Sequence, residues 1–137
     1  MKHLFSFLMI SLFVGMMQLS AQQQTIVATR SADCTNGTAE FVVPDGKIAK
    51  LYSLEISTNF NTCNASTAAP TSNYAVIYKK VVGTKTRPDI LYKKSVTDHG
   101  EIEETNGIQN IKLPAGTYIL EMSKAPNAAA KLTYSIL

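Results

Sequence analysis

The chain lacks tryptophan altogether and has only two histidines and two cysteines among its 137 residues. A serine or cysteine triad needs a histidine beside the nucleophile, and a zinc site needs several cysteines or histidines close together. Beyond residue 21 the one histidine is His99, and the sequence has neither a Cys-x-x-Cys pair nor a glycine-rich phosphate loop. These absences predict that the protein is not an enzyme.

A strong excess of one charge and helical periodicity are also missing. With 13 basic and 10 acidic side chains the formal net charge is +3, too weak to indicate a nucleic acid or an anionic membrane as partner. Apolar residues recur with a period of about two rather than 3.6 in most of the chain, and no internal repeat is present. We therefore expect strands, and no nucleic-acid partner.

The one long apolar run lies at the start of the sequence. Lys2 precedes the apolar residues 4–17, a short small-residue segment ends at Ala21, and Gln22 begins a hydrophilic stretch. This order is typical of a secretory signal peptide, of a bacterial kind or, alternatively, a eukaryotic one. The run is shorter than the roughly 20 residues that cross a bilayer, so we expect no transmembrane segment. We predict that residues 1–21 are removed and that residues 22–137 form one secreted domain, in the periplasm, at the cell surface or in the medium.

Cys34 and Cys63 both lie in the part of the chain predicted to be exported. In an oxidising compartment an isolated pair of cysteines most simply forms a disulfide. Such a bridge would close a loop of about 30 residues and stabilise the fold by roughly 3–4 kcal/mol. It would also pin the long polar segment 58–73 to the loop after the first strand. A redox or metal role is the alternative.

Short alternating segments separated by glycine and proline turns predict an all-β fold. We expect strands over residues 25–29, 38–44, 48–57, 74–82, 90–95, 108–113, 117–123 and 128–137, with a bulge near Asn110. Pro44-Asp45-Gly46 and Pro114-Ala115-Gly116 are turn signals, because proline presets φ and glycine accepts a positive one. About seven or eight such strands without a helix predict an antiparallel β-sandwich or jelly roll with one disulfide.

The alternation also predicts which side chains face the core. In the segments 117–123 and 128–137 it turns Tyr118, Leu120, Met122, Ala130, Leu132, Tyr134 and Ile136 inward. In the segment 48–57 it places Ile48, Tyr52, Leu54 and Ile56 on one face, and Ala49 and Leu51 on the other.

Basic and tyrosine side chains gather on the hairpin predicted from residues 74–82 and 90–95. Folding this hairpin about Thr86 brings Lys80 near Tyr92, and the candidate ligand surface consists of Tyr78, Lys80, Arg87, Tyr92 and Lys94. It suits an acidic polysaccharide or an acidic protein face, although such lysines also protect exposed strands from pairing. On strands only Tyr52, Tyr74, Tyr78 and Tyr92 are placed to stack on a sugar, since tryptophan is absent.

Carboxylates cluster in the polar segment 96–107, at Asp98, Glu101, Glu103 and Glu104. Their hard oxygen ligands make this segment the candidate calcium site, although an Asp-x-Asp-x-Asp-Gly loop is missing. With His99 the same carboxylates are the basis for an alternative, a small secreted hydrolase. A solvated acidic loop is the simpler interpretation, and we expect no cofactor.

The C-terminal segment 108–137 contains the turn and strand Ala115-Gly116-Thr117-Tyr118 and ends in an alternating strand around Tyr134. This pattern resembles the end of bacterial pre-peptidase C-terminal domains. The resemblance implies a small extracellular jelly roll of the kind appended to secreted enzymes, and so a fold and a location rather than an activity. The Asp-rich strand of the calcium-binding relatives is missing here, and the chain has a cysteine pair that the family does not require.

Together these patterns predict an exported, non-catalytic β-sandwich that binds or assembles with an extracellular protein or polysaccharide. A carbohydrate-binding module is the narrower alternative, and the small hydrolase is a second one. Self-assembly into a surface or fibre structure is a further alternative that the sequence leaves open.

Overall fold

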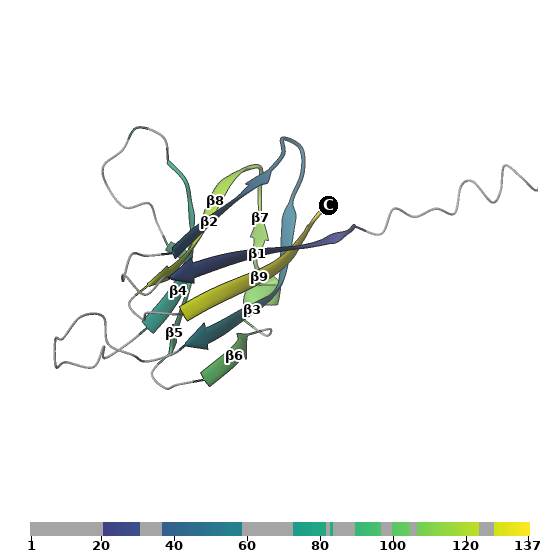
Figure 1. Cartoon of the computed structure of the whole chain (residues 1–137). Helices are drawn as coiled ribbons and strands as arrows, with labels where there is room; N and C mark the ends of the chain where they lie inside the picture. The colour runs from purple at the N-terminus through teal and green to yellow at the C-terminus, as the bar shows by residue number, and fades with distance from the viewer. Residues whose placement is uncertain are drawn as a thin grey trace, which may run out of the picture.

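The protein is a sandwich of two antiparallel β-sheets, as a computed structural model of the chain shows (Figure 1). The structure describes residues 21–30, 37–58, 73–81, 83, 90–96, 100–104, 107–123 and 128–137. Over these residues the all-β, antiparallel sandwich predicted from the sequence is confirmed, with nine strands where about seven or eight were expected. In this part of the chain no helix has the length and apolar character needed to cross a membrane.

Sheet A forms the front layer in Figure 1 and has the strand order β1-β9-β3-β6, with the short β7 also paired to β3. Its strands are β1 (Gln23–Arg30), β3 (Ala49–Thr58), β6 (Gly100–Glu104), β7 (Lys112–Leu113) and β9 (Ala128–Ile136). Sheet B has the order β2-β8-β4-β5. It consists of β2 (Gly37–Val43), β4 (Asn73–Lys79), β5 (Ile90–Val96) and β8 (Gly116–Ser123).

The core lies between the two sheets and is built from the inward positions of every long strand. Its buried members include Phe41, Leu51, Leu54, Ile56, Ile77, Ile108, Tyr118, Leu120, Met122, Leu132 and Tyr134. The ring of Phe41 packs against Tyr118 and Tyr134, with centroids 5.4 and 4.8 Å away. The inward positions predicted for β8, and those of Ala130, Leu132 and Tyr134 in β9, are therefore confirmed.

Strand β3 departs from simple alternation because it contains a bulge. Its register against β9 shifts between Leu51 and Ser53, so that Ala49 and Leu51 are buried before the bulge, and Leu54 and Ile56 after it. The predicted grouping of Ile48 with Leu54 on one face is thus wrong, since Ile48 is 44% exposed. One extra residue changes the phase of every side chain that follows it.

The region after β5 differs in two ways from the sequence prediction. Residues 100–104 form β6, which pairs with β3, where a polar loop was expected. The strand predicted over residues 108–113 begins instead as a 3-10 helix, Ile108–Asn110, which buries Ile108, and only Lys112–Leu113 is a strand. This 3-10 helix stands where a bulge near Asn110 was predicted. It directs the side chain of Ile108 into the core, although Ile108 does not fit the alternation of Ile111 and Leu113.

Several predictions fall on residues outside the described part of the chain. These are the signal peptide over residues 1–20, the segment 59–72, and the single residues Cys34, Cys63, Arg87, Asp98 and His99. The disulfide and the cleavage after Ala21 therefore stay predictions.

The two buried tyrosines of the core predict a loss of stability at alkaline pH. Burial raises the pKa of Tyr118 and Tyr134 above 10.0, and their hydroxyls donate hydrogen bonds to the Pro114 carbonyl and to Gln24 Oε1. A raised pKa means that the fold favours the neutral form. The corresponding stability is complete below about pH 10 and is lost as the pH rises above that value.

Urea unfolding measured from about pH 8 to pH 11 tests this expectation. The free energy of unfolding should fall most steeply above about pH 10, and the fall should be smaller in the double variant Tyr118→Phe, Tyr134→Phe, which has no phenol to ionise. An equal fall in the double variant would assign the pH dependence to other groups.

Candidate functional site: the outer face of sheet B

The outer faces of the two sheets differ in chemistry. On sheet A, Thr25, Thr133 and Ser53 stand side by side across three strands, and the next row contains Lys131 paired with Glu55. Tyr52, at the β3 bulge, shares a hydrogen bond of 3.0 Å with the hydroxyl of Ser135. Apart from the exposed Val27 beside Lys131 and the fully buried Ser135, the residues named here are hydroxyl and charged groups exposed at least in part, which are typical of a solvated face.

The outer face of sheet B has aromatic and apolar residues among its charges. We call it the sheet B face and define it by Glu40 and Val42 of β2, Ile119 and Glu121 of β8, Tyr74, Val76 and Tyr78 of β4, Lys80 after β4, and Lys93 of β5. The strand registers place Glu121, Val76 and Lys93 in one row across β8, β4 and β5. Glu40, Ile119 and Tyr78 form the neighbouring row across β2, β8 and β4.

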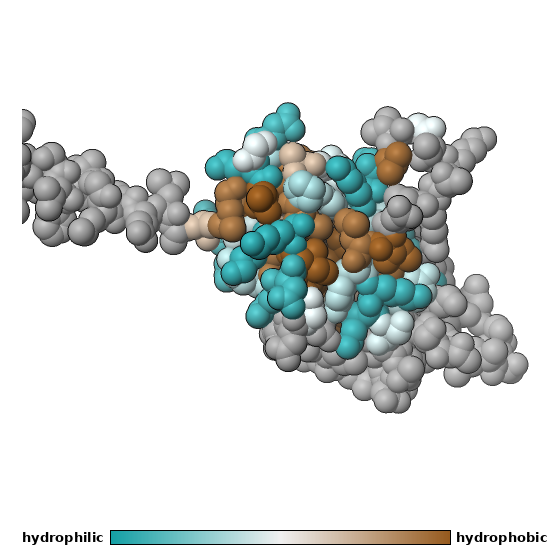
Figure 2. Space-filling view, turned by 180° about the vertical axis from the view of Figure 1, so that it is seen from behind, coloured by the Kyte–Doolittle hydropathy of each residue, from teal (hydrophilic) through white to brown (hydrophobic). Residues whose placement is uncertain are grey.

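Figure 2 views the sandwich from the side opposite to that in Figure 1, and so looks onto sheet B. Apolar side chains lie across the middle of this view, with hydrophilic side chains around them. Val42 is 57% exposed, and Val81, Ile90 and Leu91 at the margin of the face are also exposed. Exposed apolar side chains that gather on one face of a protein indicate an interaction site.

Glu121 is the most unusual residue of the sheet B face, because it is a carboxylate with only 7% exposure at an outward position. The hydroxyl of Tyr78 donates a hydrogen bond of 3.1 Å to its Oε2 atom. Its neighbour across the β4–β8 ladder, Val76, is 4% exposed. A carboxylate loses hydration when it is covered in this way, and the loss is offset only by hydrogen bonds such as that from Tyr78. The side chains around Glu121 therefore form an ordered polar centre.

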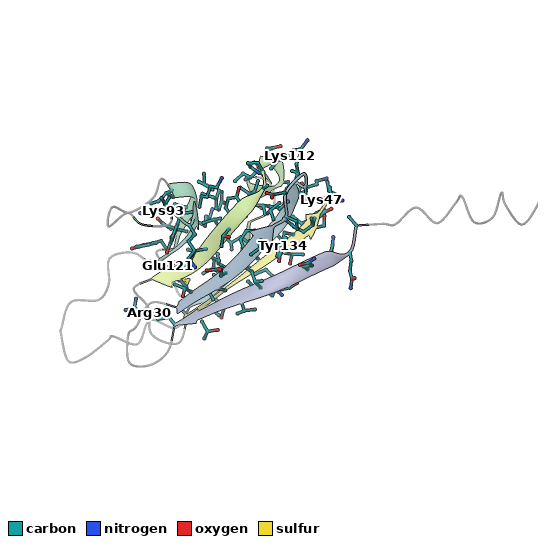
Figure 3. The ribbon with its side chains drawn as sticks, turned by 90° about the horizontal axis from the view of Figure 1, so that it is seen from above. Arg30, Lys47, Lys93, Lys112, Glu121 and Tyr134 are labelled. Atoms are coloured by element: carbon teal, nitrogen blue, oxygen red, sulfur yellow. The ribbon has the colours of Figure 1, made fainter. Side chains whose placement is uncertain are left out.

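The two lysines of the face lie at its margins, and each contacts another side chain of the face. Lys80 Nζ lies 2.6 Å from Glu40 Oε2, with both side chains almost half exposed, and Lys93 Nζ lies 4.5 Å from the centroid of the Tyr74 ring. Exposed contacts of this kind stabilise a fold by only about 0–1 kcal/mol. Both lysines are thus able to exchange these contacts for a ligand at little cost. In Figure 3 Lys93 lies on the side of the sandwich away from β1, whereas Tyr134 lies in the interior.

The predicted ligand surface is divided between the two faces of sheet B. Tyr78 and Lys80 lie on the sheet B face as expected, and Arg87 is outside the described residues. Tyr92 pairs with the buried Ile77 and packs against the core, and Lys94 pairs with the buried Ala75. A fold about Thr86 would place Tyr92 opposite Lys80, whereas Tyr92 stands opposite Ile77. This offset of three residues, an odd number, turns both side chains to the other face.

The candidate ligand surface predicted from the sequence left out three charged residues of this face: Glu40, Lys93 and Glu121. The alternation of β8 does place Glu121 outward, but nothing in the sequence signals that its carboxylate is covered. The contact between Lys80 and Glu40 joins residues 40 positions apart. Only the pairing of β2 and β4 on either side of β8 brings them together.

The candidate calcium residues lie on β6 and, in the case of Asp98, before it in the sequence. Glu101 and Glu103 stand opposite Ser57 and Glu55 in the β3–β6 ladder, at outward positions of sheet A. Glu104 stands opposite the buried Leu54, and Asp98 is outside the described residues. Among the side chains that the structure describes, no three His, Cys, Asp or Glu residues are close enough to hold a metal ion.

Comparison with known proteins identifies no family for this chain. No family model matches the chain, and no curated protein matches it. Among solved structures it is similar to one described as "CBM4 structure and function", with a TM-score of 0.35 and 8% identity over 81% of this chain and 66% of the other. It is also similar to the SPBc2 prophage-derived protein YomS, with a TM-score of 0.35 and 11% identity over 85% and 96% of the two chains. A third is the Yersinia pseudotuberculosis-derived mitogen, with a TM-score of 0.34 and 11% identity over 84% and 86%. The resemblance of residues 108–137 to pre-peptidase C-terminal domains stays a prediction.

Proposed function

We propose that this protein is a non-catalytic, exported binding protein and that its sheet B face binds a neutral polysaccharide. The observation that carries the proposal is the covered carboxylate of Glu121, hydrogen-bonded to Tyr78 at the centre of a tyrosine-bearing outer face. The scarcity of histidine favours binding over catalysis.

The spacing of the two tyrosines suits an extended ligand. Tyr74 and Tyr78 lie on the same face of β4, four residues apart, which corresponds to about 13 Å along a strand. A chain laid along β4 would meet both rings, with Val76 between them. Sugars offer an apolar ring face for stacking and hydroxyls for hydrogen bonds, and tyrosine provides a matching ring and hydroxyl.

The charges of the face favour a neutral ligand over an acidic one. Glu40 and Glu121 balance Lys80 and Lys93, and Lys80 already contacts Glu40. The hairpin considered by itself is basic, but β2 and β8 add two carboxylates to the same face. These four side chains offer donors and acceptors to hydroxyl groups without a net charge that would select an ionic ligand.

Binding to a panel of neutral and acidic polysaccharides, by affinity electrophoresis or calorimetry, tests the proposal. Tyr78→Ala should lower the affinity for a neutral polysaccharide about tenfold or more, because it removes a stacking ring and the donor to Glu121. Tyr78→Phe keeps the ring and should lose less. Glu121→Gln keeps the shape of the side chain and should show whether the charge itself is needed.

Tyr52→Ala is the matched control, since Tyr52 is a half-buried tyrosine on the opposite sheet. It should leave the affinity unchanged. The proposal is wrong if no neutral polysaccharide binds the wild-type protein, or if Tyr52→Ala weakens binding as much as Tyr78→Ala does. Thermal unfolding of each variant shows that the fold is retained.

A further inference from the structure

The two strands that end the sheets on one side of the sandwich carry opposite charges. β5 ends sheet B and β6 ends sheet A, and within the described residues each pairs with a single strand. β5 reads Ile-Leu-Tyr-Lys-Lys-Ser-Val, and β6 reads Gly-Glu-Ile-Glu-Glu. An edge strand presents unpaired backbone groups that another strand is able to take up.

β5 and β6 lie on the same side of the molecule and run in opposite directions. The first strands of the two sheets, β1 and β2, contact each other, which places β5 and β6 together at the far side, at the bottom of Figure 1. Three residues join the end of β5 to the start of β6. A connection this short reverses the chain direction, because it cannot return along the length of a strand.

Pairing of like edges is unfavourable. If two copies of β5 paired antiparallel over their full length, Lys93 would stand opposite Lys93. If two copies of β6 did so, Glu101 would stand opposite Glu103 at both ends. Like charges directly opposite each other destabilise a ladder, whereas opposite charges stabilise it. The edges therefore repel themselves and attract each other.

We propose that two copies of this chain form a two-fold dimer in which β5 of each copy pairs antiparallel with β6 of the other. A two-fold axis parallel to the strands brings sheet B of one copy into line with sheet A of its partner, so that the two sheets continue each other across the interface. Both edges of both copies are then used, so the assembly closes at two chains instead of growing into a fibre.

The pleat and the irregularity in β5 together select one register for this pairing. Lys93 is at an outward position of sheet B, and Glu101 and Glu103 are at outward positions of sheet A. Outward residues must stand opposite outward residues, and two registers that use all five residues of β6 meet this condition, with residues 90–94 or 92–96 of β5. Only the register with residues 92–96 avoids Leu91, where the pairing of β5 with β4 is irregular. This register places Lys93 opposite Glu103 and Ser95 opposite Glu101, so that the outward lysine of β5 stands opposite a glutamate of β6.

Exposed apolar residues at the start of β5 are consistent with a covered edge. Ile90 is 50% exposed and Leu91 is 43% exposed, and they lie immediately before the proposed ladder. A strand end of this kind is an aggregation hazard unless another chain or a charge protects it. The dimer brings a second copy next to both residues, and the proposal is independent of the ligand on the sheet B face.

Sedimentation equilibrium of the protein expressed from its full coding sequence, without any polysaccharide, tests the dimer. The wild type should change from monomer to dimer with concentration, and the dimer should weaken at high salt because its charged pairs are partly exposed. Lys93→Glu and Glu103→Lys should each raise the dissociation constant about tenfold or more, because each creates two repulsive pairs per dimer.

An equimolar mixture of the two variants provides the decisive measurement. In the mixed dimer both ladders again join a lysine to a glutamate, so association should return to the wild-type level. Lys47→Glu, which makes the same charge change in an exposed turn away from both edges, should leave the dimer unchanged. A wild type that stays monomeric at the highest concentration, a mixture that fails to recover, or an equal loss in Lys47→Glu would each overturn the proposal.

Discussion

Replacing Gly37 with alanine is expected to destabilise the fold by about 3 kcal/mol or more, enough to leave much of the protein unfolded. Gly37 begins β2 at the point where this strand meets the end of β1. A Cβ atom at this position would lie 2.1 Å from the carbonyl oxygen of Thr29 and 2.7 Å from the backbone nitrogen of Arg30. Because both are backbone atoms, only a separation of the two strands relieves the clash.

Gly46→Ala is the matched control for Gly37→Ala. Gly46 lies in the turn between β2 and β3 with a φ of +74°, and a Cβ there meets nothing within 4 Å. Its substitution should cost only about 1–2 kcal/mol, the strain of a left-handed backbone. Chemical denaturation of both variants compares the two costs. If Gly37→Ala lost no more stability than Gly46→Ala, the close approach of β1 and β2 would be wrong.

Leu132→Ala is expected to lower the free energy of unfolding by about 2–5 kcal/mol. Leu132 is completely buried on β9, the strand that lies between β1 and β3 in sheet A. It pairs with Ile26 on one side and with Leu54 on the other. Truncation leaves a cavity that the surrounding strands fill only in part, since their ladders fix the positions of their side chains.

Leu137→Ala makes the same chemical change at a position that is 51% exposed, and it retains the backbone hydrogen bonds to Ile48. It should cost less than about 1 kcal/mol. Urea unfolding of both variants, with equal m-values, measures the difference. Similar losses in the two variants would contradict the assignment of Leu132 to the core.

Regular alternation determined much of this fold before any tertiary contact was known. β8 and β9 have apolar side chains at every second residue, and because only one face of an antiparallel sheet is buried, this pattern identifies the inward side chains. The glycine and proline turns at residues 44–46 and 114–116 separate strands where the sequence places them. Tyr78 and Lys80 were assigned to one surface by the same local rule.

Register and the partnering of distant strands were decided only by the tertiary structure. The bulge in β3 and the three-residue offset of the β4–β5 pairing from a fold about Thr86 each reverse the facing of side chains, and neither has a local signal. The β6 strand exists because β3 offers it an edge. The burial of Glu121 arises between β8 and the neighbouring β4, and the contact between Lys80 and Glu40 spans β8 from β4 to β2. The sequence by itself determined the period-two pattern, since alternation is a property of adjacent residues, whereas phase and neighbours depend on pairing between segments far apart in the chain.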